Sequence, residues 1–217
     1  MTERIDVAAS GPARVAVRLE RATIGWNAVE ATTAIGAGLA SASVALVAFG
    51  LDSAIEIVSA TVVLLHLRAL LRGDAPDEDR ERRALRIIAV TFFALAAYVT
   101  VDAGVTLVRR EEPDTSPLGV AITSIALVVM LVLARAKRTT SDRLADAGHP
   151  ASAALLSADA AETALCAMLS LAALLGLVAN GLLGWWWADP LAGLVIVYFA
   201  VREGREAWEG ELEYDAD

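Results

Sequence analysis

Long apolar segments alternate with short polar ones along almost the whole chain. A helix needs about 20 mainly apolar residues to cross the hydrocarbon core of a bilayer. Segments of about that length recur through this sequence, so the pattern predicts an all-α protein, a six-helix transmembrane bundle. The predicted spans are residues 21–40, 43–71, 85–108, 116–136, 151–183 and 189–207.

The connections between the spans predict how neighbouring helices pair. The link near residues 38–43 is short enough to force the first two spans into an antiparallel hairpin. The third and fourth spans, and the fifth and sixth, are expected to form two more hairpins. Pro117 is typical of a helix start, and Asp189 before Pro190 is interpreted as a helix N-cap. The tryptophans at 185–187 predict a membrane–water interface.

Basic residues are distributed unevenly between the two sides of the predicted bundle. Of the 18 lysines and arginines, only Arg109 and Arg110 fall on the side opposite the termini. Cytoplasmic loops carry the excess of basic residues in membrane proteins, so both termini are predicted to be cytoplasmic. The chain then divides into a cytoplasmic N-terminal segment (1–20), a transmembrane domain (21–208) and an acidic C-terminal tail (209–217). The plasma (inner) membrane is the expected location.

The composition supports a membrane protein and excludes some functions. Hydrophobic residues make up 57% of the chain, whereas soluble domains contain about 45–50%. The formal net charge is −9, and the acids gather at 74–81, 111–114 and 203–217. These segments are predicted to be solvated, and their charge argues against nucleic-acid binding. The single cysteine excludes an intramolecular disulfide, and residues 1–14 lack the apolar core of a cleavable signal peptide.

Two polar pairs lie in the middle of apolar spans and carry the functional hypothesis. Asp52 and Glu56 are spaced i, i+4 in the second span, and Glu162 and Cys166 have the same spacing in the fifth. Each pair therefore projects from one face of its helix. A carboxylate in a bilayer costs several kcal/mol unless it is compensated, and no basic residue is expected at this depth. One interpretation is structural pairing with a Ser, Thr or Arg of a neighbouring helix. The other is a site that binds a divalent metal when ionised and protons when empty.

The donor types bear on which metal such a site would take. Oxygen and thiolate ligands at about 2.0–2.3 Å suit tetrahedral Zn²⁺. The thiolate favours Zn²⁺ or Cd²⁺, whereas three carboxylates favour Mn²⁺ or Fe²⁺; Co²⁺ is a further candidate. Cys166 has an alternative role as a small packing residue.

Other polar residues near the spans are candidates for the ion pathway. Asp159 lies on nearly the same face as Glu162, where it orients a ligand or caps a bend. Glu30 in the first span and Asp102 in the third are candidate pathway residues, although Asp102 falls near the outer end of its span. His66 is a candidate for attracting metal at the cytoplasmic entrance, with a solvated histidine as the alternative.

Three motifs resemble the cation diffusion facilitator family. They are FGLDSAIEI in the second span, SADAAETALC in the fifth and WADPLAGLVIVYFAVREG in the sixth. The resemblance places Asp52 and Glu56 on the family's first acidic pair, Glu162 on its His/Asp position and Cys166 on its final Asp. It also implies a homodimer that exports divalent metals from the cytoplasm against a proton gradient.

Two departures from the family pattern keep alternatives open. The family's cytoplasmic metal-binding domain is not found after the sixth span, which predicts a short, membrane-only member. Glu162 and Cys166 also replace the usual His and Asp, which alters the metal or abolishes transport. We expect a transporter, most simply a zinc exporter working by proton-coupled alternating access, with no enzymatic activity and no cofactor other than the transported ion. A non-transporting membrane metal sensor or scaffold is the alternative, and a membrane-embedded metal hydrolase is a third.

Overall fold

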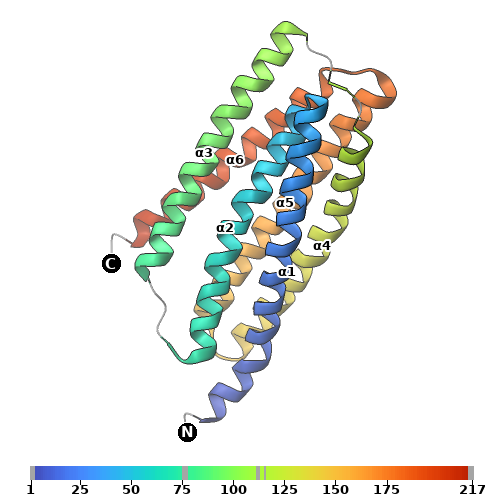
Figure 1. The fold of residues 1–217 in the computed structure, drawn as a ribbon. Helices are drawn as coiled ribbons and strands as arrows, with labels where there is room; N and C mark the ends of the chain where they lie inside the picture. Colours follow the sequence, from blue (N-terminus) through green and yellow to red (C-terminus); the bar gives the residue numbers. More distant parts are fainter. Residues whose placement is uncertain (1–2, 75–77, 111–112, 115, 215–217) are drawn as a thin grey trace.

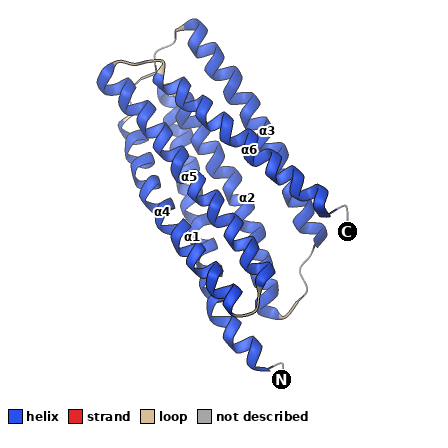
Figure 2. Ribbon diagram, turned by 180° about the vertical axis from the view of Figure 1, so that it is seen from behind, coloured by secondary structure: helices blue, strands red, loops and turns tan. Residues whose placement is uncertain are grey.

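A computed structural model describes residues 3–74, 78–110, 113–114 and 116–214 of the chain. Every regular element in this part is a helix, so the predicted all-α class is confirmed (Figures 1 and 2). The start of α1 and the end of α6 lie toward the same end of the elongated bundle (Figure 1). The helices are α1 (Glu3–Ser41), α2 (Val44–Arg72), α3 (Glu78–Arg109), α4 (Pro117–Asp146), α5 (Pro150–Leu183) and α6 (Ala188–Tyr214).

Four of these helices are long and apolar enough to cross a membrane. Within the described residues they are Val44–Arg72, Ala89–Arg109, Pro117–Asp146 and Ser152–Leu183, which lie in α2, α3, α4 and α5. Helices α1 and α6 do not meet this measure of length and composition, so the count of six spans stays a prediction. The low hydropathy of α1 has a structural cause, because its polar side chains face inward: Glu20, Thr23, Asn27 and Glu30 are all buried.

The helices divide into a group of four and a separate pair. Helices α1, α2, α4 and α5 pack against one another, whereas α3 lies along α6 (Figure 1). Both helices of the pair contact α2, and α6 also contacts α5. In the described residues α3 makes almost no contact with α4, so the predicted hairpin of the third and fourth spans is wrong. Gly204 allows the α3–α6 contact, since a Cβ there would lie 3.2 Å from the Cβ of Phe92.

Two glycines bring α1 and α2 into close contact. A Cβ on Gly38 would lie 2.8 Å from the backbone nitrogen of Val47, and one on Gly50 would lie 2.9 Å from that of Ile35. Real side chains do not tolerate such distances to backbone, so these two positions fix the spacing of the hairpin. Small residues commonly allow this approach between membrane helices.

Ser43 and Asp189 together cap the start of α2. The Ser43 hydroxyl accepts a hydrogen bond from the Leu46 N–H and donates one of 2.5 Å to Asp189. Asp189 also accepts a bond from the Ala45 N–H at 3.4 Å. The carboxylate therefore satisfies free donors at the N-terminus of α2 instead of acting as the predicted N-cap of its own helix, α6.

The fourth helix is longer than its apolar segment indicates. The apolar pattern predicts an end near residue 136, but α4 continues to Asp146. Lys137, which the sequence places in a polar link, is therefore helical, and its side chain is fully buried. The expectation that no basic residue lies among the buried acids is consequently wrong.

Candidate metal pathway

All four residues predicted to bind metal line one small cavity between α2, α3, α5 and α6. This cavity has a volume of about 10 Å³, which is close to the space that one water molecule needs. Asp52, Glu56 and Cys166 are buried and Glu162 is half-buried. The lining residues are Asp52, Glu56, Phe92, Glu162, Leu165, Cys166, Leu169, Phe199 and Glu203. The i, i+4 spacing of each pair thus brings side chains of α2 and α5 to a common wall.

The cavity is not a ready coordination sphere in this conformation. Across the described part of the chain, no group of three or more His, Cys, Asp or Glu side chains is arranged to hold a metal ion. The four predicted residues share a cavity, but their donor atoms do not converge on one point. Which of them bind a metal therefore stays a prediction.

In both Glu56 and Glu162, one carboxylate oxygen accepts a hydrogen bond and the other has no hydrogen-bond partner among the described residues. Glu56 Oε1 accepts a hydrogen bond of 2.9 Å from Thr163 on α5. Glu162 Oε2 accepts one of 2.5 Å from Ser59 on α2. Glu56 Oε2 and Glu162 Oε1 are buried and have no hydrogen-bond partner among the described residues. Buried oxygens of this kind need a proton, a water or a cation, so these two oxygen atoms are available to bind an ion.

Glu30 on α1 lies directly behind this wall. Its carboxylate accepts hydrogen bonds from Trp26 on its own helix and from Ser53 on α2, the latter at 2.7 Å. The Cys166 thiol lies 3.8 Å from the same carboxylate. Asp52 also interacts electrostatically with Glu30 and Glu56. The structure therefore places Glu30 beside Asp52, Glu56 and Cys166, although Glu30 does not line the cavity itself.

Lys137 and Glu20, neither of them among the predicted site residues, form a second buried cluster with Asp159. The Lys137 ammonium donates a 2.5 Å hydrogen bond to Asp159 Oδ2 and lies 3.3 Å from Glu20 Oε2. It also donates to the Thr163 hydroxyl at 3.0 Å. Asp159 is thus connected to Glu56 through Lys137 and Thr163, and its carboxylate binds an ammonium.

Glu203 is another cavity residue outside the predicted site. Its place in the acidic segment 203–217 predicts a solvated side chain, but Glu203 is half-buried on α6 and lines the cavity with the predicted ligands. Its Oε1 atom lacks a hydrogen-bond partner in the described structure. The helical spacing from Ile196 and Ala200, both buried, was the available signal, because i, i+4 and i+7 share one face.

Asp102 and His66 lie outside the cavity. Asp102 is half-buried on α3 and interacts electrostatically with Asp189, which is at the end of the bundle where α2 and α6 begin. His66 Nε2 on α2 is 3.1 Å from the Ser152 hydroxyl at the start of α5. The structure therefore brings neither residue to the four predicted ligands. His66 instead connects the last part of α2 to the first part of α5.

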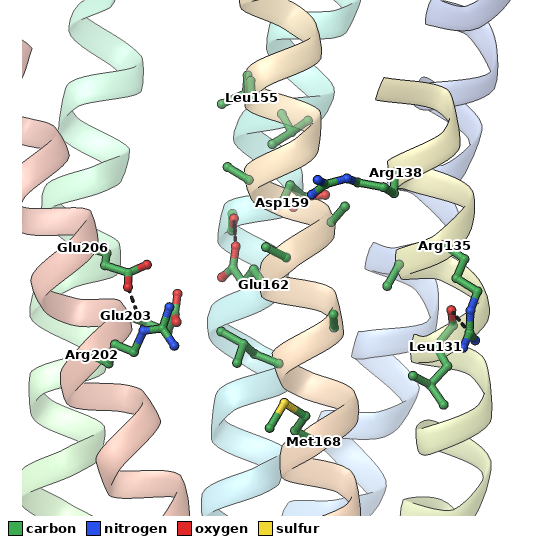
Figure 3. A pocket seen from close by; sticks show the side chains of 18 of the residues that line it. Leu131, Arg135, Arg138, Leu155, Asp159, Glu162, Met168, Arg202, Glu203 and Glu206 are labelled. Carbon is green, nitrogen blue, oxygen red and sulfur yellow. Dashed lines mark hydrogen bonds and ion pairs between the residues drawn. The ribbon is translucent and has the colours of Figure 1, made fainter. Parts of the chain in front are cut away.

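A large cavity adjoins the small one across α5. It has a volume of about 820 Å³. In Figure 3 the α5 residues Asp159 and Glu162 lie between Glu203 of α6 on one side and Arg138 of α4 on the other. Glu162 and Glu203 line both cavities. Together with Phe92 and Leu165, these two carboxylates thus lie where the enclosed cavity adjoins a wide space flanked by charged side chains.

Residues 84–210 match the cation efflux transmembrane domain. The chain therefore belongs to the cation efflux family, a class of cation transporters with membrane-spanning helices. The match includes α4, α5 and most of α3 and α6, and therefore Asp159, Glu162, Cys166 and Glu203. Helices α1 and α2, with Asp52 and Glu56, precede it. No curated protein is significantly similar to the chain.

Proposed function

We propose that this protein exports a divalent transition-metal ion, with Zn²⁺ preferred, and that Asp52, Glu56, Glu162 and Cys166 bind the ion. The observation that carries the proposal is the single cavity that these four side chains line between α2 and α5. Three carboxylates and one thiolate match the donors that zinc accepts. The family membership supplies the class of substrate, a cation.

Transport would proceed by alternating access with proton exchange. Metal from the cytoplasm reaches the cavity, the ligands move together around it, and their protons leave. Rearrangement of the helices then opens the site to the opposite side, where protons replace the metal. The unpartnered oxygens of Glu56 and Glu162 support this cycle, because such atoms accept either a proton or a metal. A homodimer in the plasma membrane with both termini cytoplasmic completes the proposal.

Flux measurements in proteoliposomes test this function. The purified protein is reconstituted with a metal-sensitive dye inside the vesicles and a pH-sensitive dye in a parallel preparation. We expect Zn²⁺ entry coupled to proton exit for the wild type, and no entry above that of protein-free vesicles for Asp52→Ala, since an intramembrane carboxylate marks the ion pathway. Asp142→Asn, which removes an exposed acid from α4, is the matched control. Metal-dependent proton movement that survives Asp52→Ala would show that the site is misassigned.

A non-transporting metal sensor or scaffold on the same fold is the second candidate. The cluster of Lys137, Asp159 and Glu20 supports it, because this cluster shows that buried acids of the bundle also serve packing. Equilibrium dialysis distinguishes the two candidates. One metal bound tightly per protomer with no flux in the vesicles would favour the sensor.

A further inference from the structure

Lys137 occupies an unusual position for a lysine. It is the only lysine in the sequence. Its side chain is 0% exposed, and no arginine or histidine with a described side chain is buried. The ammonium group lies between three helices: Lys137 is on α4, Asp159 and Thr163 are on α5, and Glu20 is on α1. A lysine is almost never fully buried unless it is paired, and here two carboxylates surround it.

The third contact of Lys137 extends its influence beyond charge pairing. The ammonium has three protons and can only donate, so the Thr163 oxygen accepts at 3.0 Å. The Thr163 hydroxyl has one proton of its own to donate. Its available acceptors are Glu56 Oε1 at 2.9 Å and the Asp159 carbonyl oxygen at 3.0 Å. Because Lys137 donates to its oxygen, Thr163 acts as a donor, and of its two acceptors the ionised Glu56 carboxylate forms the stronger, charge-assisted hydrogen bond.

This relay decides which oxygen of Glu56 remains free. Oε1 is held by Thr163, whereas Oε2 is buried and unpartnered among the described residues, on a side chain that lines the small cavity. A ligand carboxylate with one oxygen held by a hydrogen bond is oriented before the metal arrives, and such supporting contacts typically change metal affinity by about 10–100-fold.

We propose that Lys137 is a tethered cation which fills a cage of Glu20, Asp159 and Thr163 and, through Thr163, positions Glu56 so that Oε2 is free to bind an ion. The role of Lys137 as a cation in the cage stands by itself. The positioning of a ligand rests on the proposed function. Lys137 touches no transported ion in this scheme and acts only through Thr163.

A triple substitution separates the positioning role of Lys137 from a purely structural role of the cluster. Only the positioning role predicts a change in the KM for Zn²⁺. Lys137→Met combined with Glu20→Met and Asp159→Leu replaces the charged cluster by apolar side chains of similar size. Replacing a buried ionic triad in this way is often neutral or stabilising. We therefore expect the triple variant to unfold at the wild-type temperature or above. Its KM for Zn²⁺ should nevertheless rise about tenfold or more, with a smaller change in kcat, because Glu56 is no longer oriented.

Two variants of Thr163 isolate the relay with the cluster intact. Thr163→Val removes the hydroxyl and should raise KM to a similar extent, whereas Thr163→Ser keeps the hydroxyl and should stay within about threefold of wild type. If the triple variant and Thr163→Val both transport Zn²⁺ with wild-type KM, the positioning role is wrong and the cluster is only structural.

Chemical rescue tests the cage without any transport assay. Lys137→Ala leaves room for a small amine, so methylammonium chloride should raise its unfolding temperature more than the same concentration of sodium chloride. Lys137→Met, whose side chain fills the space, should show no difference between the two salts. An equal response of Lys137→Ala to both salts would overturn the tethered-cation role. Absence of Zn²⁺ binding and flux in the wild type would instead refute the proposed function, while the rescue result would still decide the role of Lys137 in the cage.

Discussion

Two groups of buried carboxylates lie side by side in this bundle, and only one of them has an internal cation. Glu20 and Asp159 surround the ammonium of Lys137. Asp52, Glu56 and Glu162 share a cavity that no described basic side chain lines. An anion removed from water needs a partner. The first group carries its partner on α4, whereas the second has spare oxygens that only a proton, a water or a cation from outside can satisfy.

The largest expected effect comes from removing the cation of the first group. Lys137→Met strands Glu20 and Asp159, and breaking a buried ion pair by removing one partner destabilises a protein by about 3–5 kcal/mol. Thermal unfolding in detergent should show a clear fall in midpoint for this single variant. Arg138→Met, which alters an exposed neighbour, is the control and should unfold like the wild type. An unchanged midpoint for Lys137→Met would mean that the ion pairs do not support the fold.

The next prediction gives the second group the cation that it lacks. Glu203→Lys places an ammonium on a residue that lines the cavity of the predicted ligands. A tethered cation there should compete with metal and raise the KM for Zn²⁺ at least about tenfold, because like charges repel strongly at short distance where water is scarce. Glu206→Lys makes the same charge change at an exposed position of α6 and is the control. Equal effects of the two variants would point to surface charge instead.

A smaller effect is expected from the sulfur donor. Cys166→Ser replaces a soft ligand by a hard one of similar size, so affinity for Cd²⁺ should fall relative to Mn²⁺ by about tenfold. Competition dialysis with both ions measures this ratio directly. A ratio unchanged by the substitution would assign Cys166 to packing, which is the alternative for a buried cysteine.

The smallest effect concerns the support of Glu162. Ser59→Ala removes the hydrogen bond to Glu162 Oε2, and a bond to a charged group contributes about 1.5–3 kcal/mol at most. Since water from the adjoining large cavity can replace the hydroxyl, we expect only a two- to threefold rise in KM, roughly what a partly compensated bond contributes. Ser124→Ala, where the hydroxyl bonds only within α4, is the control for the same truncation.

The features that sequence could predict depended on helical periodicity. The i, i+4 spacing of Asp52 and Glu56, and of Glu162 and Cys166, correctly placed each pair on one face. Their shared cavity required α2 and α5 to face each other, which spacing alone does not determine. The pairing of α3 with α6 was likewise not predictable from short connections, because it depends on how side chains of distant segments fit.

The burial of Lys137 was hard to predict because its neighbours in the sequence are charged. It lies between Arg135 and Arg138, which are exposed, and this run of basic residues resembles a solvated loop. Yet Met130, Leu133 and Ala134 are buried on the same helix, and Lys137 continues their face at spacings of three, four and seven. Extending the apolar periodicity past residue 136 would have placed the lysine inside. Helical periodicity also relates the buried polar residues of α1, because Glu20, Thr23, Asn27 and Glu30 follow one another at spacings of three or four.

The cap formed by Asp189 on α2 has a mechanical consequence. It fastens the first turn of α6 to the first turn of α2, so the two helices share an anchor at one end of the protein. Glu203 lies 14 residues further along α6, which is roughly 21 Å of helix at about 1.5 Å per residue. Swinging α6 by about 10° around this anchor would sweep Glu203 through roughly 4 Å on that lever arm, enough to open or seal the wall between the two cavities while the anchored first turn of the helix stays in place.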